Sequence, residues 1–565
     1  MSIPERYQVL FEPVEIGPVT APNRFYQVPH CTGLGWVRPR MLAELRGVKA
    51  EGGWGVVCTE YCSIHPSSDD LPFPYASLWD DGDIRSHALM TEKVHAHGAL
   101  AGVELWAGGT RSSNSFTREV PRAPASMGAG NVFSVLGAFP KQARAMDRQD
   151  IRNLRKWHRD AALRAREAGF DVVYVYAAHG YLLSQFLNPE INQRNDEYGG
   201  SVENRGRLVR ELIEETRDAV GDRCAVACRY AVNDSIAEDG SPVFGDRREI
   251  FESLADLPDL WDITVSSYSL EMGVSRFTQE ASLEPFMDFV KSVTTKPVVT
   301  VGRFTSPDTM ASQVRRGVVD FIGAARPSIA DPFLPAKIRE DRWDEIRECI
   351  GCNICYAADG LGVPIRCTQN PTMGEEWRRG WHPENVPASA SPGAVLVVGG
   401  GPAGLEAARV AGKAGHRVML AEATRELGGR INLESALPGL SEWARVRDYR
   451  VQQLEKMPNV EIFRESRLTA ADVLELAPNH VAIATGSSWR TDGFGRHNET
   501  VISGLADSER VIAPERAIQE TLPPGSYLVY DDDHYVMASA LAEKLATAGH
   551  AVSYTHLTLP TTSRV

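Results

Sequence analysis

Long apolar runs and an excess of basic charge are both missing from this 565-residue sequence. No stretch of roughly 18 apolar residues is present that could span a bilayer. The first residues, MSIPERYQVLFEPVEIG, lack the basic and apolar regions of a signal peptide. The 60 Lys and Arg against 74 Asp and Glu leave a net charge of −14, which disfavours a nucleic-acid partner. We therefore expect a soluble, cytoplasmic protein that binds neither membrane nor nucleic acid.

Cysteine is also scarce, because nine residues are too few for a disulfide scaffold in a chain of this length. Four of them, Cys349, Cys352, Cys355 and Cys367, follow the pattern C-x2-C-x2-C-x11-C. Three closely spaced thiolates and a more distant fourth suit the corners of a 4Fe-4S cluster, so we predict that these cysteines bind one. A zinc site and unligated thiols are the alternatives.

The first 340 residues alternate strand-like and helix-like segments, and eight strands can be counted. The strands are 23–31, 54–61, 99–106, 170–179, 224–230, 260–268, 297–303 and 319–326. Candidate helices between them include 40–53, 83–98, 150–169 and 200–221. Eight successive strand-helix repeats predict an α/β fold, a (β/α)8 TIM barrel. An open doubly wound sheet is the alternative.

A different unit begins after the linker VPASASPGA, with a strand, a glycine turn and a helix in AVLVVGGGPAGLEAARV. The spacing of Gly399, Gly401 and Gly404 lets a diphosphate approach the backbone at a helix N-terminus. Glu422 ends the next strand, where a carboxylate can bind ribose hydroxyls. We predict a Rossmann-like nucleotide site, whose motif does not separate ADP from FAD or NAD. A similar segment near the C-terminus carries Asp531–Asp533 instead of glycines, and this charge disfavours a second dinucleotide site.

These segments predict five divisions of the chain. Residues 1–340 would form the barrel, 341–385 the iron-sulfur segment and 386–500 the nucleotide-binding domain. Residues 501–552 would begin a second, degenerate dinucleotide-type domain. Residues 553–565, SYTHLTLPTTSRV, offer no helix and are interpreted as a non-native tail or truncation scar, which would leave the nucleotide domain incomplete.

Polar and aromatic side chains gather at the C-terminal ends of the predicted barrel strands, where barrel active sites form. The set comprises Cys31, Tyr61, Glu104, Trp106, Tyr176, His179, Arg229, Arg303 and Arg326. Arg303 and Arg326 follow the seventh and eighth strands, the usual place of a phosphate site in barrels. Gly302 and Ala325 directly precede them. We therefore predict that these two strand ends bind a phosphate group.

Barrel, cysteine motif and nucleotide unit in this order resemble the iron-sulfur flavoproteins of the old yellow enzyme class. That class includes trimethylamine, dimethylamine and histamine dehydrogenases and 2,4-dienoyl-CoA reductase. The resemblance covers about residues 5–552, and its specific stretches include YQVPHC, QFLNPEINQRNDEYGGSVENR, CIGCNIC and RRGWHPE. Within the class, YQVPHC is similar to the amine dehydrogenases, because it places Cys31 where those enzymes link a cysteine to C6 of FMN.

The resemblance implies roles for the residues at the top of the barrel. Arg229 would lie near N1 and O2 of the flavin, and Tyr61 would belong to the aromatic bowl around the amine. Tyr176 and His179 match the active-site tyrosine and histidine of the family, and with Arg229 and Tyr61 they form the predicted catalytic set. The predicted FMN contacts are Cys31, Gln27, Glu104, Arg229, Gly302, Arg303, Ala325 and Arg326.

The sequence departs from the amine oxidisers of the family in ways that bear on the substrate. After the sixth strand, TVSSYSLEMGVSRF offers no Trp and only Glu271 as a nearby acid. Near the cysteines, Asp359 stands where the trimethylamine enzyme has another Trp. Two walls of a trimethylammonium cage would thus be missing. Glu271 and Asp359 would suit a substrate with a second cationic group.

Together these observations predict an amine dehydrogenase that oxidises a small amine at FMN. Electrons would pass singly through the 4Fe-4S cluster to an external carrier, for which an electron-transferring flavoprotein is expected, and the enzyme would be a homodimer. ADP or FAD would occupy the nucleotide domain, with an affinity weakened by the shortened C-terminus. An NAD(P)H-dependent dienoyl-CoA or enoate reductase and a non-catalytic electron-transfer subunit are the alternatives.

Overall fold

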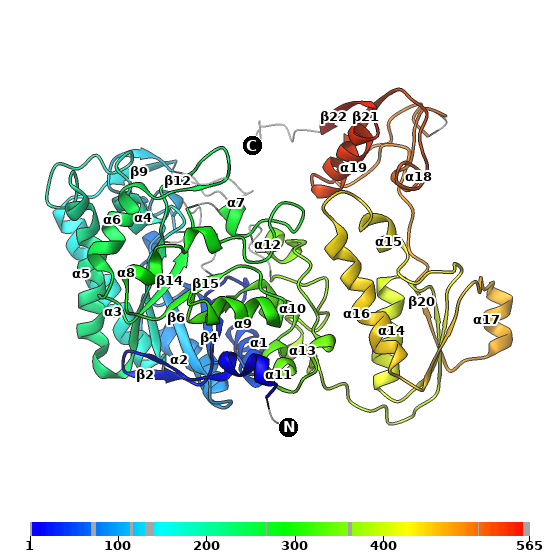
Figure 1. Cartoon of the computed structure of the whole chain (residues 1–565), viewed down its shortest axis with the longest axis horizontal. Coiled ribbons are helices and arrows are strands. Elements are labelled where there is room, and N and C mark those ends of the chain that lie inside the picture. The colour runs from blue at the N-terminus through cyan, green and yellow to red at the C-terminus, as the bar shows by residue number, and fades with distance from the viewer. Residues whose placement is uncertain are drawn as a thin grey trace. The chain divides into compact units, whose positions relative to one another are not determined.

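The computed structural model of the chain describes residues 3–68, 75–112, 117–129, 141–266, 268–359, 364–506 and 508–556. Eight parallel strands in its N-terminal part form a closed barrel, drawn in blue to green in Figure 1. They are β3 (Phe25–Gln27), β4 (Val56–Ser63), β6 (Leu100–Trp106), β10 (Val172–Ala177), β11 (Ala225–Ala231), β14 (Leu260–Thr264), β15 (Val298–Val301) and β16 (Phe321–Ala324). Each lies within a segment predicted as a strand or within two residues of it.

The ring closes because β3 pairs with both β16 and β4. Tyr26 of β3 has Gly323 of β16 as its partner on one side and Val56 of β4 on the other. A short strand, β5 (Ala76–Ser77), adds to the end of β4. The closure confirms the predicted TIM barrel and excludes the open doubly wound sheet.

The barrel strands are buried along their whole length, as their apolar sequences suggest. Every residue of β4, β10, β11, β14 and β16 is buried, which is typical of parallel sheets covered on both faces. The main covering helices are α1 (Pro39–Glu51), α2 (Gly82–His95), α3 (Arg148–Glu167), α5 (Val202–Val220), α6 (Gly245–Leu254) and α9 (Pro307–Arg315). A capping box between Asp147 and Asp150 fixes the start of α3.

Shorter elements complete the barrel part of the chain. The strands are β1 (Val14–Ile16), β2 (Val19–Ala21), β7 (Arg122–Ala123), β8 (Met127–Gly128), β9 (Gln142–Ala145), β12 (Ser235–Ile236) and β13 (Pro242–Val243). The helices are α4 (Leu182–Leu187), α7 (Tyr268–Glu271), α8 (Val290–Val293), α10 (Arg326–Ala330), α11 (Leu334–Arg339), α12 (Ile354–Asp359) and α13 (Glu376–Arg379). Of these, α7 and α12 carry residues of the site described below.

The chain divides into two compact units, residues 1–274 with 278–385, and residues 275–277 with 386–565. The cysteine-rich segment belongs to the same unit as the barrel. The second unit holds a four-stranded parallel sheet in the order β19, β18, β17, β20. Its elements are β17 (Ala394–Val398), α14 (Pro402–Lys413), β18 (Arg417–Ala421), α15 (Arg430–Glu434), α16 (Arg445–Glu455), β19 (Val460–Phe463), α17 (Ala470–Leu476) and β20 (His480–Ile483).

A second strand-helix-strand segment follows in the same unit. After α18 (Pro514–Gln519), strand β21 (Ser526–Asp531), helix α19 (Val536–Thr547) and strand β22 (Ala551–His556) form a parallel pair of strands with a connecting helix. Strand β22 runs four residues past the boundary expected at 552, and the remainder of the expected tail lies outside the described residues. Within the described ranges, no helix has both the length and the apolar character needed to cross a membrane.

Candidate active site

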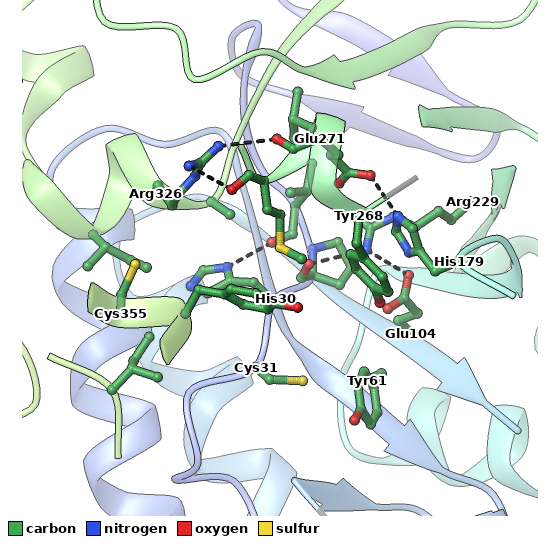
Figure 2. Close-up of a pocket in the computed structure, with 18 of the residues that line it drawn as sticks. His30, Cys31, Tyr61, Glu104, His179, Arg229, Tyr268, Glu271, Arg326 and Cys355 are labelled. Atoms are coloured by element: carbon green, nitrogen blue, oxygen red, sulfur yellow. Dashed lines mark hydrogen bonds and ion pairs between the residues drawn. The ribbon is translucent and has the colours of Figure 1, made fainter. Parts of the chain in front are cut away.

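The C-terminal strand ends of the barrel line a cavity that opens to solvent. Ten residues of the predicted site line it: Cys31, Tyr61, Glu104, Tyr176, His179, Arg229, Glu271, Arg303, Ala325 and Arg326. Figure 2 shows His179 and Glu271 on one side of this space and Cys355 on the other. A cavity with aromatic walls and several converging polar groups is typical of a cofactor site.

Three of the predicted FMN and substrate contacts in the barrel unit do not line the cavity. Gln27 is fully buried behind the wall, where its Oε1 accepts a hydrogen bond from Arg46. Gly302 lies at the end of β15, and a Cβ there would stand 2.9 Å from Phe304. Asp359 ends α12, but its side chain lies outside the described residues. The expected substrate role of Asp359 therefore stays a prediction.

Tyr176, His179 and Glu271 form a continuous hydrogen-bonded chain on one wall. The Tyr176 hydroxyl lies 2.5 Å from Nδ1 of His179, and Nε2 of His179 lies 2.6 Å from a carboxylate oxygen of Glu271. The Thr264 hydroxyl donates to the same carboxylate. With Nε2–H donating to Glu271, a neutral imidazole leaves Nδ1 free to accept the Tyr176 hydroxyl proton.

The charge state of Glu271 follows from its neighbours. Burial by itself raises the pKa of this carboxyl, but its close contact and hydrogen bond with the His179 imidazole, together with Arg229, outweigh burial and lower the pKa to about 2. Glu271 is thus a carboxylate at neutral pH. Because Tyr176 is buried, its own pKa is raised well above the ordinary value, so its hydroxyl keeps its proton. The chain can accept a proton at the Tyr176 oxygen and pass one on to His179.

Arg229 lies between two buried carboxyl groups. It donates to Asp262 over 3.0 Å, and its Nη1 lies 3.2 Å from Oε1 of Glu104. Burial raises the pKa of Glu104 to about 8 and that of Asp262 to about 6, although Arg229 lowers both. Oε1 of Glu104 is buried and, apart from this ion pair with Arg229, accepts no hydrogen bond. A buried oxygen that can still accept a hydrogen bond at the cavity wall fits a bound group that offers an N–H, such as a flavin ring.

Aromatic rings form the remaining wall. Tyr61 stacks on Trp106 with 4.5 Å between ring centroids, and Tyr181 lies against both rings. Tyr268 stacks on His179 at 4.1 Å, and its hydroxyl lies 3.1 Å from that of Tyr181. The sequence prediction of a missing wall after the sixth strand overlooked Tyr268. Its position three residues before Glu271, one helical turn away, was the available signal.

The two arginines predicted to bind phosphate both line the cavity. Arg326 donates to the carbonyl oxygen of Gly273 over 2.9 Å and to Oδ1 of Asn353 over 2.6 Å. Arg303 donates to the carbonyl oxygen of Cys349. Both side chains thus tie the cysteine segment to the barrel, and they place two guanidinium groups at the cavity, where an FMN phosphate would bind. Their role as phosphate ligands stays a prediction.

The four cysteines of the motif lie near one another in an apolar setting. Burial and, to a smaller extent, the neighbouring Cys349 and Cys352 raise the pKa of Cys367 to about 12. Burial and the other three cysteines likewise raise the pKa of Cys355 well above its ordinary value. Thiolates in such a place need positive charge from bound metal, so the donor set fits an iron-sulfur cluster.

No three His, Cys, Asp or Glu side chains in the described ranges form a group that could hold one metal ion. The cluster assignment therefore stays a prediction from the cysteine motif and its spacing, with zinc as the alternative.

Three residues beside the cavity were not found from the sequence. His30 lines it, and Arg46 and Lys49 of α1 approach His30 from behind. Arg46 donates to the His30 carbonyl oxygen over 2.7 Å. Neither cation was distinguishable in the sequence from the charged residues of a solvent-exposed helix face, because only the packing of α1 buries them.

The glycine turn of the second unit has the geometry of a diphosphate site. Gly399 has a φ of +106°, and a Cβ on Gly404 would lie 1.8 Å from the Gly399 carbonyl oxygen. At Gly401 a Cβ would meet nothing within 4 Å, which leaves open space at the start of α14. Glu422 accepts hydrogen bonds from the Gly400 amide and from Thr424. The turn is therefore preformed, and Glu422 helps to hold it.

Fold and site together define an FMN-dependent oxidoreductase. Residues 9–345 match the NADH:flavin oxidoreductase / NADH oxidase family, and residues 393–522 match the pyridine nucleotide-disulphide oxidoreductase family. The chain belongs to the NADH:flavin oxidoreductase / NADH oxidase family, because that match spans more than half of its length.

Similar proteins narrow the resemblance to enzymes that act on amines. The chain is 42% identical over 566 residues to dimethylamine dehydrogenase of Hyphomicrobium sp. (strain x), covering 98% of this chain and 77% of that protein. It is 48% identical to the solved histamine dehydrogenase of Rhizobium sp. 4-9, with a TM-score of 0.90 and coverage of 98% and 80%. It is 50% identical to the solved 6-hydroxypseudooxynicotine amine oxidase of Pseudomonas geniculata N1, with a TM-score of 0.92 and coverage of 98% and 82%. These similarities confirm the predicted resemblance to amine dehydrogenases and the predicted enzyme class.

Proposed function

We propose that the protein is an amine dehydrogenase that oxidises a small amine to an imine, which water then hydrolyses to an aldehyde and a smaller amine. The observation that carries this proposal is the chain Tyr176–His179–Glu271, which faces an aromatic cavity beside Arg229. Amines are mostly protonated at neutral pH, and oxidation at the α-carbon needs the neutral form. A proton acceptor beside an aromatic wall meets that need.

The residues perform this step as a relay. The Tyr176 oxygen accepts the ammonium proton, the hydroxyl proton moves to Nδ1 of His179 over 2.5 Å, and Glu271 stabilises the resulting imidazolium. FMN, when bound, supplies the chemistry that takes up the α-hydrogen and two electrons. Arg229 would balance negative charge on the reduced ring, and Tyr61 and Tyr268 would hold the substrate by contact with their ring faces.

The substrate we favour carries a second polar group. Four tyrosines, Tyr61, Tyr176, Tyr181 and Tyr268, line the cavity with hydroxyl groups as well as rings, so the wall is less apolar than a cage of indole rings. Such a wall suits an amine with a hydrogen-bonding or cationic arm better than it suits trimethylamine, and Asp359 would add an acid for that arm.

The linkage between FMN and Cys31 is also part of the proposal. The Cys31 sulfur points into the cavity near Tyr61 (Figure 2), where it can bond to C6 of the flavin. We expect flavin to stay with the precipitate after acid treatment of the parent protein, and to be released from Cys31→Ser. Complete recovery of the parent's flavin in the supernatant would contradict the covalent link.

Electrons would leave the flavin singly through the 4Fe-4S cluster held by Cys349, Cys352, Cys355 and Cys367. We propose an electron-transferring flavoprotein as the acceptor, ADP or FAD in the glycine turn of the second unit, and a homodimer in solution. None of the nine cysteines, all of which lie in the described ranges, forms a disulfide, which suits a reducing compartment such as the cytoplasm.

Product analysis tests the proposed reaction. Purified protein is incubated with dimethylamine, trimethylamine or histamine and a one-electron acceptor such as ferrocenium, and aldehyde is trapped with a hydrazine. We expect one aldehyde for each two acceptor molecules reduced. If no amine gives aldehyde and NADPH reduces an enoyl thioester instead, the reductase alternative is correct.

A further inference from the structure

Two cations of α1 are fully buried beside the cavity. Arg46 and Lys49 both have an exposed fraction of 0%. Arg46 donates to Gln27 Oε1 over 2.9 Å and to the His30 carbonyl oxygen over 2.7 Å, and Lys49 lies 3.2 Å from Nε2 of His30. All of these acceptors are neutral. Two buried positive charges therefore lie side by side with no hydrogen bond to a carboxylate among the described residues.

Nearby acids supply only part of the missing negative charge. The buried Glu60 attracts Arg46, although burial raises the pKa of this carboxyl. Burial lowers the pKa of Arg46 to about 10, so its guanidinium stays charged at neutral pH. Glu376 of α13 attracts Lys49, but burial raises the pKa of this carboxyl to about 7, and neither of its oxygens has a hydrogen-bond donor. Since burial lowers the pKa of Lys49 as well, its ammonium needs a stronger anion nearby to remain protonated.

The cysteine segment lies against the same helix. Met41, Leu42 and Leu45 of α1 form the apolar cluster against which Cys355 and Cys367 pack. Met41, Leu45 and Lys49 follow one another at intervals of four residues, so they share one side of α1. As a thiolate bound to the cluster, Cys355 would favour the ammonium form of Lys49. The buried cations thus contact His30, which lines the flavin cavity, and they belong to the helix that shares an apolar cluster with the cysteines.

We propose that Arg46 and Lys49 are positioning residues that raise the reduction potential of the 4Fe-4S cluster and so draw electrons from the flavin to it. The proposal rests on the proposed function for its assignment of the cluster to these cysteines. In the step concerned, reduced flavin loses one electron and the cluster gains it. The cluster with its thiolates is then more negative by one charge, and the two fixed cations stabilise that charge in a region that water does not reach.

The midpoint potential of the cluster tests this directly. The purified holoenzyme is titrated with dithionite, and the reduced cluster is counted by electron paramagnetic resonance, without amine. For Lys49→Met we expect at least a tenfold loss in the equilibrium constant for cluster reduction, about 59 mV for one electron. Lys49→Arg, which keeps the charge, is expected to stay within twofold of the parent.

A third variant separates charge from packing. Glu376→Gln removes a carboxyl near Lys49, and we expect it to leave the potential unchanged or to raise it. A lowered potential in all three variants would mean that packing, and not charge, is responsible, and would overturn the proposal. An unchanged potential in Lys49→Met with full iron content would also overturn it.

The test is independent of the amine reaction. Should Lys49→Met lose its cluster, Arg46→Gln is measured in its place, because it also removes one of the two charges. We again expect at least a tenfold loss in the equilibrium constant for cluster reduction, and an unchanged constant would overturn the proposal. A parent protein that binds no iron would overturn this inference together with the cluster assignment, whereas aldehyde formation at FMN would be judged on its own.

Discussion

The cavity of the barrel and the glycine turn of the second unit are both sites expected to bind a nucleotide, yet they are built differently. In the barrel, side chains from separate strands converge, and Oε1 of Glu104, paired with Arg229, accepts no hydrogen bond. In the second unit, the backbone forms the site, and Glu422 is already bonded to the turn. The difference supports our proposal that the barrel site catalyses the reaction, whereas the glycine turn only binds a nucleotide.

The largest expected effect concerns the cysteines. Cys352→Ala should abolish turnover with a one-electron acceptor and remove the broad visible absorption of the cluster, while the amine still reduces the flavin once, because the flavin's contacts lie in the barrel. The control is Cys224→Ala, which alters a buried cysteine outside the motif. Normal turnover by Cys352→Ala would show that electrons bypass this segment.

His179→Gln should have the next largest effect. It removes the group that links Tyr176 to Glu271, so we expect kcat/KM for the amine at pH 7 to fall by about 10²–10⁴-fold. The loss should shrink as pH rises, because more of the substrate is then neutral. His158→Gln, at a buried histidine of α3, is the matched control. An equal loss in both variants would indicate damage to the fold instead of the relay.

The glycine turn of the second unit is tested by its affinity for ADP, on which we expect a smaller effect. Glu422→Ala should lower the affinity for ADP by about tenfold, measured by calorimetry, because Glu422 supports the Gly400 amide and would bind the ribose. Glu426→Ala, at an exposed neighbour, is the control. We expect aldehyde formation to stay at the parent rate in both. If Glu422→Ala lost amine oxidation together with ADP affinity, the proposal that the barrel catalyses and the turn only binds would be wrong.

The smallest expected effect is on stability at high pH. Burial raises the pKa of Glu104 from 4.5 to about 8, so the folded state binds this proton more tightly than the unfolded state does. The stability that it contributes is complete below about pH 4.5 and is lost as pH rises towards 8. Relative to the parent, Glu104→Gln should therefore gain thermal stability between pH 5 and pH 9, on the order of 2–4 °C. A difference that does not vary with pH would show that Glu104 is ionised throughout.

Much of the fold could be predicted from the sequence, because parallel barrel strands are continuous apolar runs and glycine turns have fixed spacing. The strand ends also predicted which residues face the cavity, since side chains after parallel strands meet at one edge. Two features could not be predicted in this way. Tyr268 enters the site only through the short helix α7, and the burial of Arg46 and Lys49 depends on how α1 packs against the cysteine segment. Contacts between distant segments leave no local pattern.

Anaerobic mixing of the oxidised protein with single substrates tests the central claim most directly, with flavin absorbance as the readout. The account predicts that a small amine bleaches the flavin within one turnover, that NADPH does not, and that His179→Gln slows the bleaching by the same factor as turnover. Rapid bleaching by NADPH, with none by dimethylamine, trimethylamine or histamine, would contradict it.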